Sequence, residues 1–210
     1  MLTTIYLIRH GECEGNREGL FRGRFNYPLN EQGIEQARSL ATELMNVPLD
    51  AVYTSPLTRA YQTAEIVCQG RSIAPIIEEG FNNIYLGAWE GKPKSEVEKE
   101  QPHEFRLWRT EPEKLRMEGA ETLDLVQKRA VSSLIRITGE RRGGGFAVVT
   151  HRAVLKPLIA GLLGIPEPYF WKLTPETASY SIVEHTDERG FSLVLFNQTR
   201  HLKAFIREDV

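Results

Sequence analysis

The chain has 210 residues, of which 41% are hydrophobic and 26% charged, and its formal net charge at pH 7 is -2. A chain of this size can bury a substantial core, and a charge so close to zero argues against nucleic acid or an anionic membrane as the main partner. Cys13 and Cys68 form no CxxC pair, which argues against a disulfide scaffold or a structural zinc site.

The hydrophobic pattern of the N-terminal third predicts alternating strands and helices. Residues 3–8 are β-branched and aromatic, as in a buried strand, and residues 33–45 place apolar side chains at helical spacing. A second strand is predicted over 49–55, followed by a helix over 56–68 that begins with proline, a residue suited to a helix start. The strand, loop and helix therefore occur twice.

Residues 71–120 interrupt this alternation. They contain many charged residues, several prolines and five aromatic side chains, and we interpret them as an inserted region with short helices. Within this region the basic and aromatic stretch 104–116 is compatible with two readings, a solvated helix face or a contact to substrate.

The alternation resumes in the C-terminal half. The pattern predicts a long amphipathic helix over 121–141, a strand over 146–150 and a helix over 153–164 that ends in glycine. Two strands, 178–185 and 191–197, are then predicted to form an antiparallel hairpin at the sheet edge. We therefore expect a single α/β domain over residues 1–210, with a mostly parallel sheet between two helical layers.

Arginine and histidine residues follow three of the predicted strands. Arg9 and His10 end the first strand, Arg59 lies in the first turn of the helix after the second, and His151 and Arg152 follow the strand 146–150. The carboxyl ends of parallel strands meet at one rim of a sheet, where ligands usually bind. Guanidinium groups donate paired hydrogen bonds to phosphate, so the pattern predicts a phosphate-binding pocket.

The two histidines add chemistry that arginine lacks. A neutral imidazole such as that of His10 is a competent nucleophile toward phosphorus, and covalent catalysis divides one difficult displacement into two easier ones. A second imidazole, that of His151, can donate to the transferring oxygens.

Four segments, taken with their order, resemble the motifs of the histidine phosphatase superfamily, also called the phosphoglycerate mutase-like family. They are "LIRHGECEGN", "YTSPLTRAYQTA", "LGAWEG" and "VVTHRAVLK". The resemblance covers nearly the whole chain. It implies the three-layer phosphoglycerate mutase-like fold, with the inserted region at about 71–120 covering the site, and it implies no metal or other cofactor.

The resemblance also implies roles for individual residues. His10 matches the nucleophile that becomes a phosphohistidine, while Arg9, Arg59 and His151 match the rest of the phosphate pocket. Gly11 is expected to let the backbone turn sharply beside the nucleophile. The candidate phosphate- and substrate-binding set is Gly11, Asn16, Arg22 and Arg152, although Arg152 stands where the family commonly has glycine.

The proton donor of the family is missing from its usual position. The family commonly has a glutamate four residues before the first glycine of the segment "GAWEG", and here that residue is Asn83. An amide cannot donate a proton to a departing alkoxide. Another acid could replace it, with Glu12, Glu79 and Glu90 as candidates; the substrate could have a good leaving group; or the protein could bind phosphate esters without efficient turnover.

The resulting hypothesis is a metal-independent phosphomonoesterase that acts on a small phosphorylated metabolite through a phosphohistidine at His10. One alternative is a phosphate-ester-binding protein with weak turnover, motivated by Asn83. Within the family, phosphoglycerate mutase and α-ribazole phosphatase activities are further alternatives, and the short chain favours the phosphatase branches over the mutases. We expect neither nucleic acid nor membrane as a partner, and a homodimer is compatible with the sequence.

The cysteine usage, the lack of a signal-peptide pattern and the lack of any apolar run of about 20 residues predict a soluble protein of the reducing cytoplasm.

Overall fold

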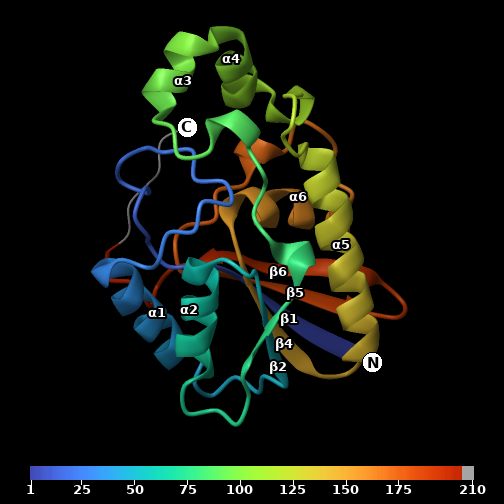
Figure 1. Ribbon diagram of the computed structural model, residues 1–210. Helices are drawn as coiled ribbons and strands as arrows, with labels where there is room; N and C mark the ends of the chain where they lie inside the picture. Colours follow the sequence, from blue (N-terminus) through green and yellow to red (C-terminus); the bar gives the residue numbers. More distant parts are fainter. Residues whose placement is uncertain (205–210) are drawn as a thin grey trace.

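The computed structural model describes residues 1–204 and contains one six-stranded sheet with the strand order β3-β2-β4-β1-β5-β6 (Figure 1). The first four strands along the sheet pair in parallel, whereas β5 is antiparallel to β1 and β6 is antiparallel to β5. The strands are β1 Leu2–Arg9, β2 Ala51–Thr54, β3 Pro75–Ile77, β4 Gly145–Thr150, β5 Tyr180–Thr186 and β6 Gly190–Gln198. The predicted mostly parallel sheet with an antiparallel C-terminal edge is confirmed.

Four helices cover the two faces of this sheet. They are α1 Glu31–Glu43, α2 Thr58–Cys68, α5 Leu123–Glu140 and α6 Arg152–Leu163. Because side chains alternate along a strand, Ala147 and Val149 of β4 pack with α1 and α2, while Phe146 and Val148 pack in the cluster that contains α5 and α6. The result is the expected three-layer arrangement.

Local capping sets where two of these helices begin. The Asn30 side chain accepts a hydrogen bond from the backbone N–H of Gly33 at 2.8 Å, and the Thr122 hydroxyl accepts one from Leu125 at 3.3 Å. Each cap satisfies an N–H group that has no partner within its helix. Gly164, with φ of 64°, ends α6 in the left-handed conformation that glycine adopts without strain.

The inserted region begins later than the sequence indicates. β3, which lies inside the range 71–120, pairs in parallel with β2 and extends the central sheet. The strand has three residues, starts with proline and exposes Ile76 and Ile77, so it lacks the buried pattern by which a strand is recognised.

The remainder of the range 71–120 forms short helices, as predicted. These are η1 Glu79–Phe81, η2 Gly87–Trp89, α3 Lys94–Glu100, α4 Pro102–Thr110 and η3 Pro112–Lys114. Figure 1 shows α3 and α4 together at the top of the molecule, apart from the layer of α1 and α2. Trp108 of α4 packs edge-on against Phe21 at 5.6 Å and Phe170 at 5.5 Å between ring centroids, which attaches this region to the rest of the protein.

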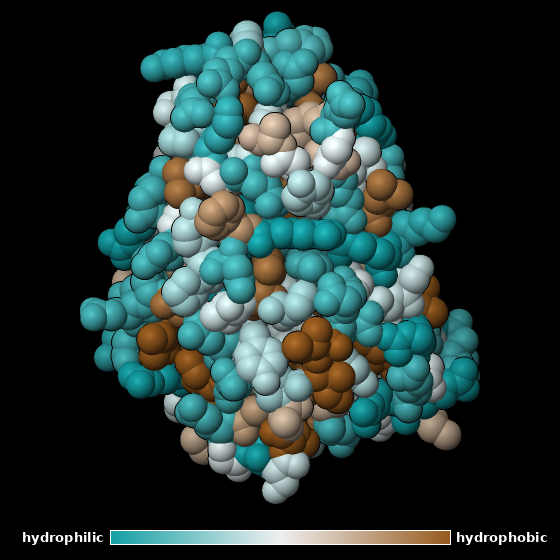
Figure 2. All heavy atoms as spheres, in the orientation of Figure 1, coloured by the Kyte–Doolittle hydropathy of each residue, from teal (hydrophilic) through white to brown (hydrophobic). Residues whose placement is uncertain are grey.

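The surface carries mostly polar side chains. Figure 2 shows hydrophilic residues over most of the visible face, with hydrophobic ones in separate small groups. Within residues 1–204, none of the helices combines the length and the apolar character that crossing a bilayer requires.

Candidate active site

The register of the two central parallel strands brings the two histidines together. Arg9 of β1 pairs with Thr150 of β4, and the N–H of His10 donates to the carbonyl of Thr150 at 3.0 Å. His10 and His151 both follow these paired residues, and their ring centroids lie 5.0 Å apart with an interplanar angle of 59°. The convergence predicted from the strand ends is therefore present in the structure.

Both arginines of the pocket are held by backbone carbonyl groups. Nη1 of Arg9 donates to Pro175 at 2.9 Å, while Nη1 and Nη2 of Arg59 donate to Phe25 at 2.8 Å and Gly23 at 2.9 Å. The side chains of both arginines are buried. Carbonyl groups are neutral, so they fix a buried guanidinium without cancelling its positive charge. That charge can then attract an anion that enters the cavity. The loops that supply these carbonyls were not found by sequence analysis.

The environment of His10 keeps its imidazole neutral, and the residue lines the cavity. Nδ1 of His10 lies 2.6 Å from the carbonyl oxygen of Gly11, and because a carbonyl can only accept, Nδ1 carries the proton and Nε2 the lone pair. Burial, followed by the charges of Arg59, Arg9 and Arg22, holds the pKa of His10 well below its ordinary value of 6.5. At neutral pH the imidazole is unprotonated at Nε2.

His151 is also neutral and has one ring nitrogen available. Its Nε2 lies 2.8 Å from the Ser55 hydroxyl, which accepts a hydrogen bond from the N–H of Leu57 at 3.3 Å. Burial and the charge of Arg59 lower the pKa of His151 well below 6.5. Nδ1 of His151 is buried and has no hydrogen-bond partner among residues 1–204. Ser55, which orients this ring, was missed as a site residue, although it lies in the quoted segment "YTSPLTRAYQTA".

Three further predicted residues line the same cavity: Asn16, Arg22 and Arg152. The Oδ1 atom of Asn16 accepts from the N–H of Cys13 at 2.9 Å, which closes the turn after β1. Nη1 of Arg22 lies 3.6 Å from the Cys13 sulfur. The structure therefore brings the phosphate-binding candidates from the first loop and from the start of α6 to one place.

Gly11 is required for a reason different from the predicted one. Gly11 is not one of the glycines with positive φ in residues 1–204, so the left-handed conformation does not explain why glycine is needed there. A Cβ at Gly11 would instead lie 2.5 Å from the carbonyl oxygen of Gly33 at the start of α1. The prediction of a sharp glycine-specific turn is wrong, and close approach of two backbone segments is the physical cause.

Asn83 lies in the wall of the cavity, next to Arg59. Its Nδ2 atom donates to the carbonyl of Gly23 at 2.7 Å, the same oxygen that accepts from Arg59. This contact fixes the orientation of the amide, because only its nitrogen can donate to a carbonyl. The Asn83 side chain is buried and its Oδ1 has no hydrogen-bond partner within the described chain.

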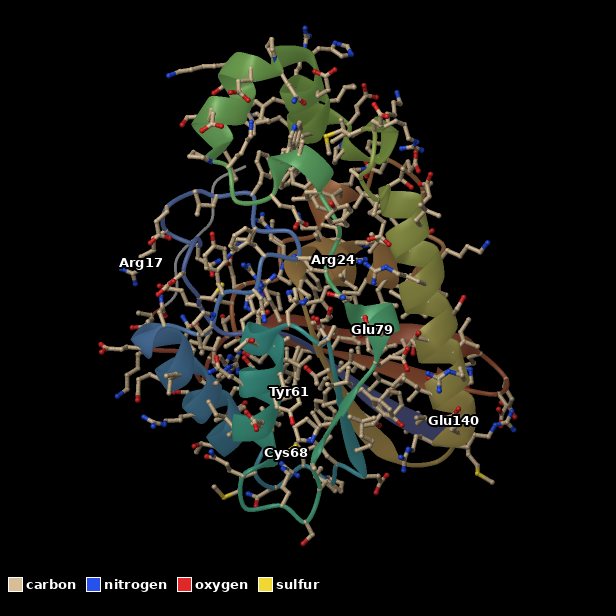
Figure 3. The ribbon with its side chains drawn as sticks, viewed as in Figure 1. Arg17, Arg24, Tyr61, Cys68, Glu79 and Glu140 are labelled. Carbon is tan, nitrogen blue, oxygen red and sulfur yellow. The ribbon has the colours of Figure 1, made fainter. Side chains whose placement is uncertain are left out.

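Two of the three candidate replacement acids are engaged outside the cavity. Glu12 is fully buried, and its Oε1 accepts from Arg17 at 2.7 Å and from Asn30 at 2.9 Å. Figure 3 shows Arg17 at the side of the molecule, above α1. Glu79 is exposed on η1, where it accepts from Asn82 at 3.2 Å. Neither carboxylate lines the cavity.

Glu90 is also held away from the cavity. Its Oε1 accepts from the backbone N–H of Arg24 at 2.7 Å and of Leu86 at 3.1 Å, behind Gly23. Among residues 1–204, no aspartate or glutamate lines the cavity. The structure therefore does not bring Glu12, Glu79 or Glu90 to the position that Asn83 occupies, because each is committed to a neighbouring polar group.

The inserted region contributes side chains that sequence analysis did not assign. Lys94 of α3 and Trp108 of α4 line the cavity, together with Phe170 and Trp171 of η4 Phe170–Lys172. By contrast, the basic residues of the stretch 104–116 do not line it: Arg106 and Arg109 are exposed, Lys114 pairs with Glu111, and Arg116 pairs with Asp124 at 2.8 Å. Those basic side chains form a solvated surface, whereas Trp108 from the same stretch reaches the site.

Comparison with known proteins identifies the family. The family model for the histidine phosphatase superfamily (branch 1) matches residues 5–199. The chain belongs to the histidine phosphatase superfamily. The resemblance drawn from the four motifs is thus confirmed. The prediction of a phosphatase agrees with the names of the similar proteins, which are phosphatases.

Two curated relatives are similar over most of their length. Phosphoserine phosphatase 1 of Hydrogenobacter thermophilus is 33% identical over 207 residues, covering 99% of this chain and 98% of the relative. The adenosylcobalamin/alpha-ribazole phosphatase of Salmonella typhimurium is 32% identical over 180 residues, covering 86% of this chain and 89% of the relative.

Solved structures agree with this superfamily fold. Bacillus stearothermophilus YhfR has a TM-score of 0.92 and 34% identity, covering 96% of this chain and 100% of that chain. Phosphoserine phosphatase from Entamoeba histolytica, solved in complex with 3-phosphoglyceric acid, has a TM-score of 0.84 and 26% identity. The match covers 95% of this chain and 99% of that chain.

Proposed function

We propose that the chain is a metal-independent phosphomonoesterase that hydrolyses a small phosphorylated metabolite through a phosphohistidine at His10. The observation that carries this proposal is the state of His10: a neutral ring whose proton is on Nδ1, beside two buried arginines and a second imidazole. These residues provide the nucleophile and the positive charge that phosphoryl transfer needs.

In the first step, Arg9, Arg59 and Nδ1 of His151 donate hydrogen bonds to the phosphoryl oxygens. Nε2 of His10 forms a bond to phosphorus, and the bond from phosphorus to the ester oxygen breaks with its electron pair on that oxygen. Water then attacks the phosphohistidine and releases inorganic phosphate and the imidazole. The positive groups are positioned before the reaction, so they stabilise the transition state without reorganisation.

The departing ester oxygen must take a proton, and Asn83 cannot supply it. In this proposal the proton comes from water, since none of the described carboxylates lines the cavity. A positioned acid contributes roughly 10²–10⁴-fold to the rate of such a step. Alkyl phosphates should therefore react slowly, whereas esters with a stable leaving anion should react well.

A second candidate function is a phosphate-ester-binding protein with weak turnover, and the same residue favours it. Asn83 preserves the polar wall of the pocket while removing the acid. The named relatives act on phosphoserine or α-ribazole phosphate, and both substrate types, as well as mutase activity, remain candidates for this chain.

Trapping of the phosphoenzyme separates the two functions. The protein is mixed with p-nitrophenyl phosphate, quenched within milliseconds, and analysed by mass spectrometry for an acid-labile phosphoryl group on His10. We expect a burst of nitrophenolate equal to the phosphoenzyme, and His10→Ala should lose the phosphoenzyme and at least 10³-fold of the turnover. Tight binding of phosphate by calorimetry, with no phosphoenzyme and no turnover, would instead establish the binding protein.

A further inference from the structure

The peptide unit between Gly23 and Arg24 is contacted from both sides by side chains around the site. Its carbonyl oxygen accepts from Nη2 of Arg59 at 2.9 Å and from Nδ2 of Asn83 at 2.7 Å. Its N–H donates to Oε1 of Glu90 at 2.7 Å. The N–H and C=O of a trans peptide point in opposite directions, so Glu90 and Arg59 lie on opposite sides of this unit. The reaction described above gives Glu90 no role.

Glu90 joins this peptide to the inserted region. The residue follows directly after η2, and the same Oε1 atom also accepts from the backbone N–H of Leu86 at 3.1 Å. A Cβ at Gly23 would lie 2.1 Å from this oxygen, so the carboxylate packs directly against the peptide. Hydrogen bonds to an ionised acceptor are stronger than those between neutral groups. The carboxylate therefore fixes residues 23–24 to the segment that carries Leu86.

Asn83 is held by the same two residues of the loop. Its side chain donates to the carbonyl of Gly23, and its own backbone carbonyl accepts from Nε of Arg24, labelled in Figure 3, at 3.0 Å. Nη2 of Arg129 on α5 donates to that carbonyl at 3.1 Å, and Nε of Arg129 donates to Glu121 at 2.7 Å. The loop and the cavity wall at Asn83 are thus interlocked, and a displacement of the Gly23–Arg24 peptide would disturb both.

The placement of Glu90 also suits the charge of Arg59. Burial lowers the pKa of the Arg59 guanidinium to about 10, and the negative charge of Glu90 acts in the opposite direction. Within residues 1–204 the two groups form no direct ion pair, because the peptide lies between them. A carboxylate in direct contact would compete with phosphate for the guanidinium donors. Glu90 therefore supports the buried cation from behind without occupying those donors.

We propose that Glu90 is a positioning residue, which holds the guanidinium of Arg59 and the amide of Asn83 in place through the Gly23–Arg24 peptide. A peptide unit is planar, so an acceptor that fixes its N–H also fixes the direction of its carbonyl. The inference rests on the proposed function, in which Arg59 binds the phosphoryl group. It assigns Glu90 a task different from that of the replacement acid considered from the sequence.

The test measures the Kd of inorganic phosphate by calorimetry for three variants of Glu90. Glu90→Ala removes the acceptor and should raise the Kd by about tenfold or more. Glu90→Gln keeps the length and an acceptor oxygen, so its Kd should stay within about threefold of that of the natural protein. Glu90→Asp keeps the charge but is too short to reach both N–H groups, and it should bind phosphate more weakly than Glu90→Gln. The reverse order would show that charge, rather than the contact, matters and would overturn the inference.

Glu113→Ala is the matched control for a general loss of stability. One carboxylate oxygen of Glu113 also accepts from two backbone N–H groups, those of Tyr169 and Phe170, which lie outside the loop of residues 23–24. The free energy of unfolding should fall in both alanine variants, whereas only Glu90→Ala should weaken phosphate binding. An equal rise of the phosphate Kd in both variants would show a purely structural role for Glu90 and would contradict the proposal.

A spectroscopic measurement without ligand separates this inference from the proposed function. Hydrogen bonds at both Nη atoms restrict rotation of the guanidinium, so ¹⁵N NMR should resolve Nη1 and Nη2 of Arg59, with Arg59→Lys assigning the signals. In Glu90→Ala the two signals should merge. If the natural protein neither binds nor hydrolyses phosphate esters, the phosphatase proposal fails, while merged signals still support the role of Glu90. Unchanged Arg59 signals and phosphate affinity in Glu90→Ala would reject that role and leave the phosphatase intact.

Discussion

Arg59 and Asn83 donate to one acceptor, the carbonyl oxygen of Gly23, at 2.9 and 2.7 Å. This shared oxygen places the Asn83 amide directly beside the guanidinium of Arg59, and both residues line the cavity. In the proposed function Arg59 binds the phosphoryl group, so Asn83 lies close to that group and presents an amide, which cannot donate an acidic proton.

Asn83→Glu should restore a proton donor. We expect turnover of an alkyl ester such as 3-phosphoglycerate to rise by roughly 10²–10⁴-fold, because the departing alkoxide needs the proton. Hydrolysis of p-nitrophenyl phosphate should change far less, since nitrophenolate leaves without help. Asn83→Gln, which has the length of glutamate and no acidic proton, is the matched control in the steady-state assay. Efficient cleavage of both esters by the natural protein would show that another acid acts.

The two site imidazoles should remain neutral below pH 6.5. Their pKa values are lowered by burial and by neighbouring arginines, so protonation requires a pH well under the ordinary value. Long-range ¹H–¹⁵N NMR at pH 6.5 should show His10 as the Nδ1–H tautomer with Nε2 unprotonated, as the contact to Gly11 requires. Observation of a doubly protonated His10 at that pH would contradict the assignment of the nucleophile.

The same pKa shifts make stability depend on pH. In the unfolded chain His10 and His151 take up protons near pH 6.5, whereas in the folded chain they do so only at lower pH. Between these values the unfolded state binds more protons, so the free energy of unfolding falls as pH decreases below 6.5. Urea titrations at pH 7 and pH 5.5 measure the effect. His151→Asn, which removes one titrating ring, should reduce the difference between the two titrations.

Glu113 holds the segment that carries Phe170 and Trp171. Its buried Oε1 accepts from the backbone N–H of Tyr169 at 2.7 Å and of Phe170 at 2.8 Å. Glu113→Ala leaves both donors without this acceptor and should lower the free energy of unfolding by about 2–4 kcal/mol. Glu113→Gln keeps an acceptor oxygen, so it should lower the free energy of unfolding by less than half of that amount. Denaturant unfolding checks both, and equal losses would show that the packing of the side chain, rather than the acceptor, matters.

Gly33 should tolerate no side chain. A Cβ there would lie 1.8 Å from the carbonyl oxygen of Glu12, and backbone cannot move aside as a flexible side chain does. Gly33→Ala should therefore destabilise the protein by about 3 kcal/mol, at the upper end for overpacking. Gly139→Ala in α5 is the control, because its Cβ would meet nothing within 4 Å, and alanine should favour the helix by up to about 1 kcal/mol. Thermal unfolding of the two variants gives the comparison.

By itself, the amino-acid sequence determined the alternation of strands and helices and the meeting of Arg9, His10, Arg59 and His151. Periodicity reports which residues are buried, and parallel strands bring their carboxyl ends to one rim, so local pattern is sufficient for both. The order of residues in four motifs was sufficient for the family.

The tertiary structure alone decided which loops meet. It excluded Glu12 and Glu90 from the cavity by binding them to other polar groups, assigned β3 to the sheet, and brought Lys94 and Trp171 to the site from distant elements. It also showed that Gly11 is needed because another backbone segment passes close to it. Most of these contacts join different segments of the chain, and neither periodicity nor motif spacing contains information about them.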